Sequence, residues 1–174
     1  MGKRLLDDLI GSGLSNVKLL DGDQLRQQLE ESGKRYGYST ADRNALMMEY
    51  ADIAMALNKD GYTCILCAIA HVRRTREEVR QRIGNYMEVY LDCPVEACAA
   101  RDQKGQYAKA FDGLYDNFIG VTEPYQRSEH VELKLDTARS SIEECSSILL
   151  HEALSFLRKE ERTRTSRPRG LFNR

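Results

Sequence analysis

The feature that most constrains this chain is a short apolar run that ends abruptly in two acids and a glycine. The run covers residues Val17 to Leu20, and Asp21-Gly22-Asp23 leads from it directly into a helix-like pattern. This sequence predicts a strand that turns into a helix at its carboxyl end. Because ligands of open α/β sheets bind at the carboxyl ends of strands, the two carboxylates are candidates for holding a metal or accepting a proton. The simpler interpretation is an ordinary turn in which Asp23 caps the helix.

The rest of the chain repeats the same order of strand and helix. Near-continuous apolarity over residues 62–69 predicts a strand that is covered on both faces, as in a parallel sheet. Strands that alternate with helices predict a layered α/β fold with a parallel sheet. Lysines, glycines and aromatic residues over 103–121 predict a mobile loop-helix-loop, with a polar surface excursion as the alternative. We expect further strands at 17–20, 86–91 and 132–135, and helices at 4–12, 23–32, 40–58, 142–157 and from about Val95.

Length, charge and hydropathy narrow the class of protein. With 174 residues the chain suits one domain, which we expect over residues 1–157, followed by a basic, disordered tail over 158–174. A formal net charge of −1 gives no global reason to expect nucleic-acid binding, and we favour a solvated tail over one that binds nucleic acid. No apolar run approaches the roughly 18 residues of a membrane span, and acids interrupt the segment where a secretion signal needs an apolar core. We therefore predict a cytoplasmic protein without a membrane partner.

Candidate sites elsewhere in the chain are weaker. Cys64 and Cys67 lie three residues apart within a predicted strand, so their side chains point to opposite faces and favour core packing over a zinc site. Arg73 and Arg76 follow the end of the same strand. They either face an anionic ligand or belong to a solvated helix start, and the sequence leaves both interpretations open.

Five stretches in order resemble the adenylylsulfate (APS) kinase family. The similarity extends from about residue 5 to residue 157. This resemblance implies a P-loop kinase fold and an activity that transfers the γ-phosphate of ATP to the 3′-hydroxyl of APS, giving the activated sulfate donor PAPS. The stretches are Leu19–Arg26, Gly37–Arg43, Tyr86–Pro94, Arg101–Ala110 and Phe118–Gly120, with Pro124-Tyr125 after them.

The resemblance assigns the acidic and basic candidates to the chemistry of phosphoryl transfer. By this resemblance Asp23 orients or deprotonates the attacking 3′-hydroxyl, and Asp21 supports it and holds Mg²⁺. Arg26 and Arg43 would hold the anionic part of APS. ATP is the implied co-substrate. These roles suit a reaction that needs in-line positioning and charge neutralisation more than covalent help.

The resemblance also implies residues that bind the nucleotide. Tyr38 stands where the family usually has phenylalanine and would stack on the APS adenine, with Phe118 on the other side. Ile69 would line that pocket. Lys104, in the lid, would contact substrate, and Arg101 lies where the lid meets ATP. The predicted partners are therefore a nucleotide substrate and, as an open option, a second copy of the chain in a homodimer.

Several positions depart from the family pattern. Gln24, Leu46 and Asn117 replace a family asparagine, a second asparagine and a lid glycine. Ala70 and His71 replace a serine and a proline after the strand that ends in Ile69. Each lost hydrogen bond to a polar substrate group costs about 1–3 kcal/mol. The acceptor therefore either is APS or is another nucleotide conjugate such as cytidine diphosphoramidate, and a non-catalytic nucleotide-binding protein is a further alternative.

The largest departure concerns the phosphate-binding loop. A P-loop kinase needs a strand, then G-x-x-x-x-G-K-[ST], then a helix, and these 174 residues contain no such sequence. Gly2-Lys3-Arg4 resembles its end, but Arg4 offers no hydroxyl for magnesium. The absent strand would be central in the sheet. We expect an N-terminally incomplete kinase. The alternatives are a degenerate protein that binds nucleotide without turnover and a protein in which another chain fills the gap in the sheet. We predict weak or no ATP-dependent kinase activity for these 174 residues.

Overall fold

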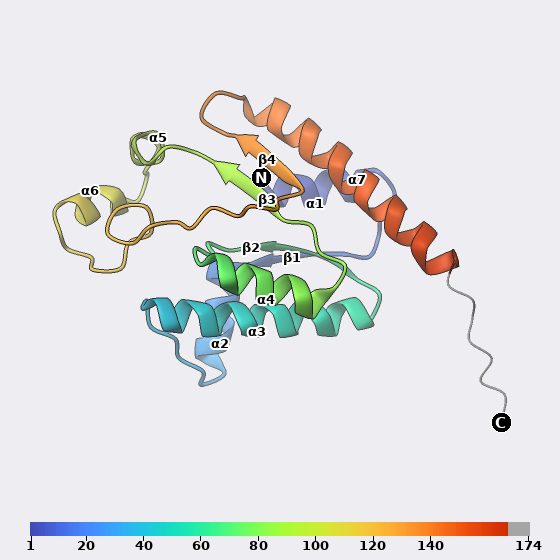
Figure 1. The fold of residues 1–174 in the computed structure, drawn as a ribbon, viewed down its shortest axis with the longest axis horizontal. Coiled ribbons are helices and arrows are strands. Elements are labelled where there is room, and N and C mark those ends of the chain that lie inside the picture. Colours follow the sequence, from blue (N-terminus) through green and yellow to red (C-terminus); the bar gives the residue numbers. More distant parts are fainter. Residues whose placement is uncertain (167–174) are drawn as a thin grey trace.

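The computed structural model describes the backbone of residues 1–166 and the side chains of residues 1–159. Helices and strands alternate along the chain, as the sequence pattern predicts (Figure 1). The helices are α1 (Gly2–Gly11), α2 (Gly22–Glu31), α3 (Thr40–Lys59), α4 (Arg73–Ile83), α5 (Val95–Ala100), α6 (Gln106–Phe111) and α7 (Ile142–Ser166). The strands are β1 (Val17–Asp21), β2 (Thr63–Cys67), β3 (Val89–Asp92) and β4 (Leu133–Asp136).

The strands form two separate two-stranded sheets. β1 pairs in parallel with β2, and β3 pairs in parallel with β4. Within the described residues no ladder joins β2 to β3, which agrees with the central strand that the sequence lacks. The strand predicted over 62–69 is shorter, and every residue of β2 is half-buried rather than fully covered. Helices nevertheless pack on both faces of β2, as the sequence predicts, because Leu66 packs against the cluster of α3 and Ile65 against the cluster of α1 and α7. The half-burial of β2 goes with an edge that has no hydrogen-bonded neighbour among the described residues.

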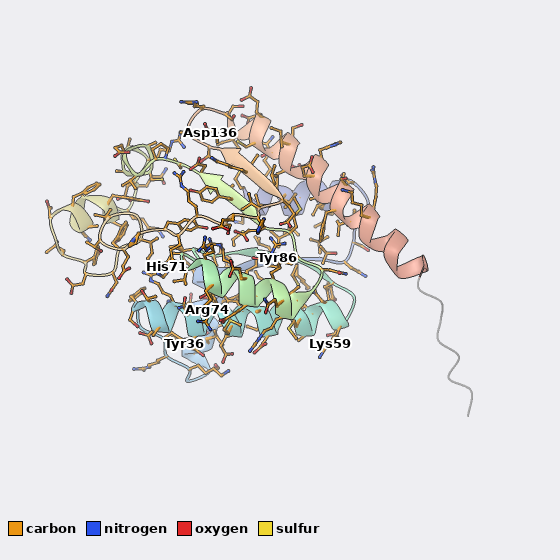
Figure 2. The ribbon with its side chains drawn as sticks, viewed as in Figure 1. Tyr36, Lys59, His71, Arg74, Tyr86 and Asp136 are labelled. Carbon is orange, nitrogen blue, oxygen red and sulfur yellow. The ribbon has the colours of Figure 1, made fainter. Side chains whose placement is uncertain are left out.

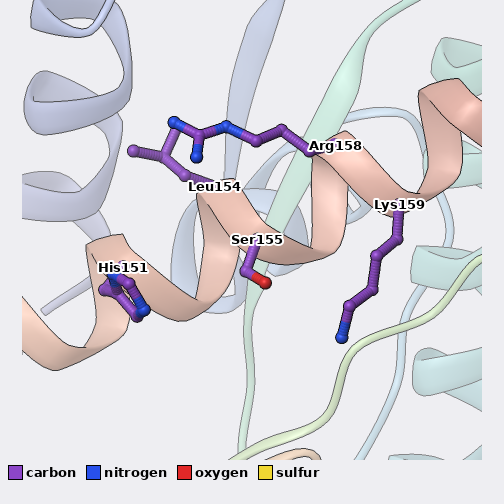
Figure 3. A pocket seen from close by; sticks show the side chains of 5 residues that line it. All are labelled: His151, Leu154, Ser155, Arg158 and Lys159. Atoms are coloured by element: carbon purple, nitrogen blue, oxygen red, sulfur yellow. The ribbon is translucent and has the colours of Figure 1, made fainter.

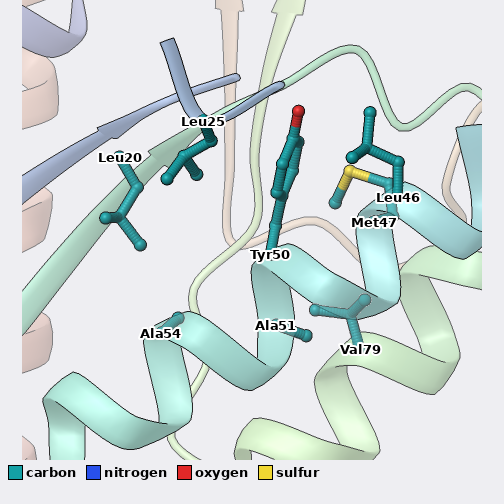
Figure 4. Packing of buried hydrophobic residues seen from close by; sticks show 8 residues of the cluster. All are labelled: Leu20, Leu25, Leu46, Met47, Tyr50, Ala51, Ala54 and Val79. Atoms are coloured by element: carbon teal, nitrogen blue, oxygen red, sulfur yellow. The ribbon is translucent and has the colours of Figure 1, made fainter. Parts of the chain in front are cut away.

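Helix α3 packs the first apolar cluster against β1, β2 and α4 (Figure 4). Its buried face repeats at helical spacing, as the sequence predicts. Tyr50 is only 3% exposed, and its hydroxyl donates a 2.7 Å hydrogen bond to the carbonyl of Gly22. The same helix that closes this cluster therefore also fixes the turn between β1 and α2. The buried members are Leu20, Leu25, Leu46, Met47, Tyr50, Ala51, Ala54 and Val79.

A second apolar cluster lies between α1 and α7 and bridges the two sheets. Leu9 is 1% exposed and lies at its centre. Ile65 of β2 and Val89 of β3 both pack against it, so α1 and α7 cover one face of both sheets. Helix α7 continues to Ser166, beyond residue 157, where the predicted domain ends, and into the predicted tail. The part of that tail over 167–174 lies outside the described residues.

On the other face, two arginines of α4 connect the sheets through charge. Arg76 is 3% exposed and pairs with Glu88, just before β3, at 3.0 Å. Arg80, one turn later, pairs with Glu132, just before β4, at 2.6 Å. Arg73 pairs instead with Glu129 at the surface. Arg76 is therefore buried and neutralised, and the interpretation in which it faces an anionic ligand is wrong. For Arg73, whose ion pair lies at the exposed surface, both interpretations stay open.

The lid projects from the end of the second sheet. Figure 1 shows α5 and α6 beyond the carboxyl end of β3, at the left of the view. A turn from Asp112 and a loop return the chain from α6 toward β4. The helix within a loop that the sequence predicts here is α6. No helix among the described residues is long and apolar enough to cross a membrane.

Candidate functional site

The Asp21-Gly22-Asp23 turn joins β1 to α2 through a side-chain cap. One carboxylate oxygen of Asp21, Oδ1, accepts the backbone N–H groups of Asp23 and Gln24 at 3.0 and 3.3 Å. Asp21 is therefore the N-cap of α2, and the prediction that Asp23 caps this helix is wrong. A Cβ on Gly22 would lie 2.8 Å from the carbonyl oxygen of Cys67, so the approach of the turn to β2 requires glycine.

Asp23 is released from capping and lies at the surface. Its side chain is exposed and forms no hydrogen bond or ion pair within the described residues. It lines a shallow hollow with Arg26, Gln27, Glu30 and Tyr38. The carboxylate is thus free to accept a proton or a hydrogen bond from a ligand, and an arginine lies within the same hollow.

Arg26 and Arg43 converge on the ring of Tyr38. Their guanidinium carbons lie 4.7 and 5.5 Å from the ring centroid. Arg26 donates to the carbonyl of Tyr36 at 2.7 Å, and Arg43 donates to the carbonyl of Tyr38 at 3.0 Å. In the part of the chain that the structure describes, no carboxylate lies within 4.0 Å of either guanidinium. Asp42 acts on Arg26, and Glu123 on Arg43, only at longer range, so neither arginine is engaged in an ion pair in this part of the chain.

The electrostatics of this arginine pair favour an anionic ligand. Burial lowers the pKa of Arg43, and the neighbouring charge of Arg26 lowers it further. Two cations that repel each other and contact only neutral groups gain free energy when an anion joins them. The pair can therefore grip a phosphate or sulfate group beside Asp23.

The start of α3 places Arg43 by local hydrogen bonds. Ser39 caps the helix by accepting the N–H of Asp42 at 3.1 Å, and its hydroxyl donates to the Asp42 carboxylate at 2.6 Å. The bond from Ser39 holds the pKa of Asp42 below its usual value. Asp42 is thereby engaged with the cap and forms no ion pair with Arg43, the next residue, among the described residues. Ser39 is therefore the N-cap of α3.

The lid reaches the site through Arg43. Its Nη2 donates to the carbonyl of Asn117 at 3.2 Å, next to Phe118. Phe118 stacks on Tyr115 with 5.9 Å between centroids and meets Tyr107 edge-on at 4.9 Å. The aromatic residues of the lid therefore form one cluster, and Arg43 connects that cluster with Tyr38.

His71 is part of this region, although the sequence marked it only as a departure from the family pattern. It is 2% exposed, and its ring lies 3.4 Å from the hydroxyl of Thr40 at the start of α3. Burial lowers the pKa of His71, and the charge of Arg43 lowers it further. Figure 2 shows His71 and Tyr36 at the same end of the α3–α4 pair, toward the lid. Its position in the turn between β2 and α4, beyond the carboxyl end of β2, is the signal that points to the site.

Three predicted site residues are less closely associated with the turn. Ile69 is 57% exposed beyond the end of β2. Lys104 is exposed in the lid. Arg101 is also exposed and donates to the carbonyl of Thr137 at 2.9 Å, on the side of the second sheet. The contacts within the chain bring Asp21, Asp23, Arg26, Tyr38, Arg43 and Phe118 into one region, and leave the roles of these other three residues as predictions.

The donor set suits a magnesium ion held together with a substrate. Both N–H groups at the cap bond to Oδ1 of Asp21, and its second oxygen has no partner among the described residues. No group of three acidic, histidine or cysteine side chains in residues 1–159 could enclose a metal. Mg²⁺ is usually bound through one or two carboxylates, several waters and substrate phosphates, and one free carboxylate oxygen fits that arrangement.

A second hollow lies on α7 and is remote in sequence from these residues. His151, Leu154, Ser155, Arg158 and Lys159 line it (Figure 3). All five come from one helix. No acidic side chain lines this hollow, so it offers no counterpart of Asp23.

Comparison with known proteins covers this same region. The family model described as "Adenylylsulphate kinase" matches residues 2–136. An adenylyl-sulfate kinase of Synechococcus sp. (strain JA-3-3Ab) is 41% identical over 139 residues, which cover 80% of this chain and 77% of the relative. An adenylyl-sulfate kinase of Deinococcus deserti is 37% identical over 144 residues, 83% of this chain and 77% of the relative.

Solved structures give the same result in three dimensions. The APS kinase of Mycobacterium tuberculosis, solved in complex with AMPPNP and APS, superposes with a TM-score of 0.79 at 30% identity. The match covers 87% of each chain. A hexameric APS kinase from Thiobacillus denitrificans has a TM-score of 0.62 at 24% identity and supports the fold alone.

Proposed function

Because this chain belongs to the adenylylsulfate kinase family, we propose that it binds APS at Asp23, Arg26 and Arg43 and presents the 3′-hydroxyl of APS to the γ-phosphate of ATP. One observation carries the proposal. Two arginines without a carboxylate partner converge on the ring of Tyr38, next to a carboxylate that forms no bond within the described chain. That combination places together two arginines that can bind an anion, a ring on which a nucleobase can stack, and a carboxylate that can accept a proton.

Each group then has a distinct part in the reaction. The arginines hold the phosphate and sulfate of the acceptor through charge-assisted hydrogen bonds. The ring of Tyr38 is 62% exposed, so it has surface left for the adenine, and Phe118 of the lid closes from the other side. Asp23 accepts the proton of the 3′-hydroxyl or fixes its direction of attack.

The ATP side of the reaction is supported by fewer residues. Asp21 would hold Mg²⁺ through its second oxygen, and the bound ion supplies neutralisation of the phosphate charge. Lys104 and Arg101 would act from the lid on the substrate and on ATP. These 174 residues contain no G-x-x-x-x-G-K-[ST] sequence. We therefore expect this polypeptide alone to turn over ATP far below the roughly 1–100 s⁻¹ of kinases.

The test separates binding from transfer. Calorimetry should show that the 174-residue chain binds APS more tightly than 5′-AMP, which lacks the sulfate. Asp23→Asn should keep this preference and lose the slow formation of 3′-phosphorylated product that sensitive radiolabel assays detect. Equal affinity for APS and 5′-AMP would contradict the anion grip, and unchanged product formation by Asp23→Asn would contradict the role of Asp23.

A second candidate is a kinase of another nucleotide conjugate, such as cytidine diphosphoramidate. Leu46 stands where the family has a substrate-facing asparagine, and it is 5% exposed within the first apolar cluster, where it cannot bind a polar substrate. Tighter binding of the cytidine conjugate than of APS would favour this candidate. Tight APS binding with no product over hours would instead favour a non-catalytic nucleotide-binding protein.

A further inference from the structure

Arg76 holds two segments at once in a way that its ion pair alone does not require. Its Nη1 donates to the carbonyl of Ala70 at 2.6 Å, in the turn that follows β2. Its Nη2 donates to the carbonyl of Gln126, and its Nε to the hydroxyl of Ser128 at 2.9 Å. The guanidinium carbon also lies 4.9 Å from the ring centroid of Tyr125. Arg76 therefore binds both the β2–α4 turn and the return segment, defined here as residues 121–128, which follows the lid.

We propose that Arg76 is a positioning residue for the acceptor site, because it fixes the return segment and the β2–α4 turn relative to each other and so sets how the lid approaches Arg43. This inference rests on the proposed acceptor site. Arg76 itself is buried and neutralised by Glu88, so it does not touch the substrate. It acts through the residues that it holds.

The turn that Arg76 holds is strained. Ala70 has a φ of 33°, which makes it the only residue other than glycine with a positive φ in the described chain. A side chain in this region persists when surrounding contacts over-determine the backbone. Arg76 provides such a contact at the carbonyl of Ala70. The strained residue lies between Ile69 and His71, so its conformation directs both of these side chains.

A second set of bonds ties the same two segments together. The N–H of Gln126 donates to the carbonyl of His71 at 2.9 Å. The side-chain oxygen of Gln126 accepts the N–H of Arg73 at 3.1 Å, where α4 begins without any other side-chain cap. The return segment is therefore fixed at the start of α4 by backbone and side-chain bonds, and the bonds of Arg76 add to them.

Arginines thus hold the lid at both of its ends, and among the described residues only one of the two arginines forms an ion pair. Arg43 bonds the carbonyl of Asn117 before the return segment, and Arg76 bonds the carbonyl of Gln126 within it. Arg43 has no acidic partner, so an anionic ligand competes with Asn117 for its donors. Arg76 is saturated by Glu88, Ser128 and carbonyl groups, so its hold does not change with the ligand. The lid residues that precede the return segment therefore move on binding of the acceptor, while the return segment stays fixed.

The test uses Arg76→Lys in the full 174-residue chain, with Arg80→Lys as a matched control. A lysine keeps the charge beside Glu88, but one ammonium group cannot reach the acceptors that the planar guanidinium reaches. Arg80 lies one helical turn away, pairs with Glu132 and also with Glu88 at 3.6 Å, and bonds neither Ala70 nor the return segment among the described residues. We expect Arg76→Lys to weaken APS binding at least tenfold and to speed proteolytic cleavage within residues 103–128 severalfold, and Arg80→Lys to do neither.

Rescue distinguishes positioning from a general loss of stability. Adding Ala70→Gly to Arg76→Lys removes the strain at the turn and should restore a large part of the APS affinity. If Arg76→Lys does not fold, Glu88→Gln loosens the same guanidinium while keeping its shape. For that variant too, we expect weaker APS binding and faster cleavage of residues 103–128.

The outcomes are separable from those of the proposed function. Equal effects of Arg76→Lys and Arg80→Lys on affinity, or unchanged cleavage of the lid, would overturn the positioning role. If the unmodified chain fails to bind APS, the proposed function fails, and the cleavage comparison still decides whether Arg76 positions the return segment.

Discussion

Two pairs of arginines in this protein have opposite surroundings. Arg76 and Arg80 of α4 are paired with Glu88 and Glu132, and Arg76 is almost fully buried. Within the described part of the chain, Arg26 and Arg43 hydrogen-bond to carbonyl groups and lie against the ring of Tyr38, and neither forms an ion pair. Arginine therefore connects two sheets through ion pairs in one region and keeps its donors accessible to an anion in the other. The presence or absence of a carboxylate partner distinguishes the two uses.

The difference follows from what each region must stabilise. Among the described residues no backbone ladder joins β2 to β3, so side chains on both faces hold the sheets together. A buried arginine needs a counter-charge there, because an unpaired charge in the interior is strongly unfavourable. At the Asp21-Gly22-Asp23 turn the backbone is already fixed by the cap and by Tyr50. Arginines in this second region can remain unneutralised, since water and ligands reach them.

The largest effect is expected from Glu88→Ala. It would leave the guanidinium of Arg76 buried without a counter-charge, which destabilises folded proteins by about 3–5 kcal/mol. Urea unfolding followed by circular dichroism would measure the loss. Glu88→Gln, which keeps the hydrogen-bonding shape, should lose less. If Glu88→Ala lowers the free energy of unfolding by less than about 1 kcal/mol, the ion pair of Arg76 does not stabilise the fold and the two arginine pairs do not differ in this respect.

Arg43→Ala should weaken ligand binding rather than the stability of the fold. We expect the dissociation constant for APS to rise by about ten- to a hundredfold, since hydrogen bonds to charged groups contribute about 1.5–3 kcal/mol. Calorimetry measures it. The matched control is Arg82→Ala, which removes an exposed arginine paired with Asp52 and should leave APS binding unchanged. Comparable weakening by both variants would mean that overall charge, not the grip, governs affinity.

Phe118→Leu tests the aromatic side of the site. Loss of a stacked ring typically costs about 1–3 kcal/mol per base, so we expect several-fold weaker APS binding. Phe111→Leu is the control, because Phe111 lies in the same lid, contacts Tyr107 and is 58% exposed. Equal affinity of the two variants would remove Phe118 from the binding surface.

A smaller effect is expected from pH. Burial lowers the pKa of His71, so the folded state prefers the neutral ring. The unfolded chain therefore binds the proton more readily, and stability should fall as pH drops below the ordinary histidine pKa of about 6.5, then level off below the folded pKa. Unfolding free energies at pH 7.5 and 5.5 would measure this decline.

Asp42 and Glu49 do not contribute to the change in stability between pH 7.5 and 5.5. Hydrogen bonds to Ser39 and Lys34 lower the pKa values of Asp42 and Glu49, so their contributions are present above their unfolded pKa values and are lost only in more acid solution. His71→Asn should flatten the profile between pH 7.5 and 5.5. An equally steep decline in that variant would assign the effect to other groups.

Local signals in the sequence determined the elements and much of the site. The Val17–Asp21 strand, the α3 stripe with Tyr50, and the Ser39 cap depend on residues that are close in sequence, where periodicity and short-range hydrogen bonds decide the structure. The predicted parallel strands are confirmed for the same reason, since each strand carries its own pattern. Family motifs identified Asp23, Arg26 and Arg43 as candidates.

Only the tertiary structure decided which charged groups remain free. Arg76 and Glu88 are twelve residues apart, and Arg43 meets Asn117 across 74 residues, so no local pattern reveals that the first arginine is neutralised and the second is not. The cap at Asp21 likewise depends on the geometry of the turn beside β2. A sequence lists charges, but neutralisation depends on distance, and distance is set when remote segments pack together.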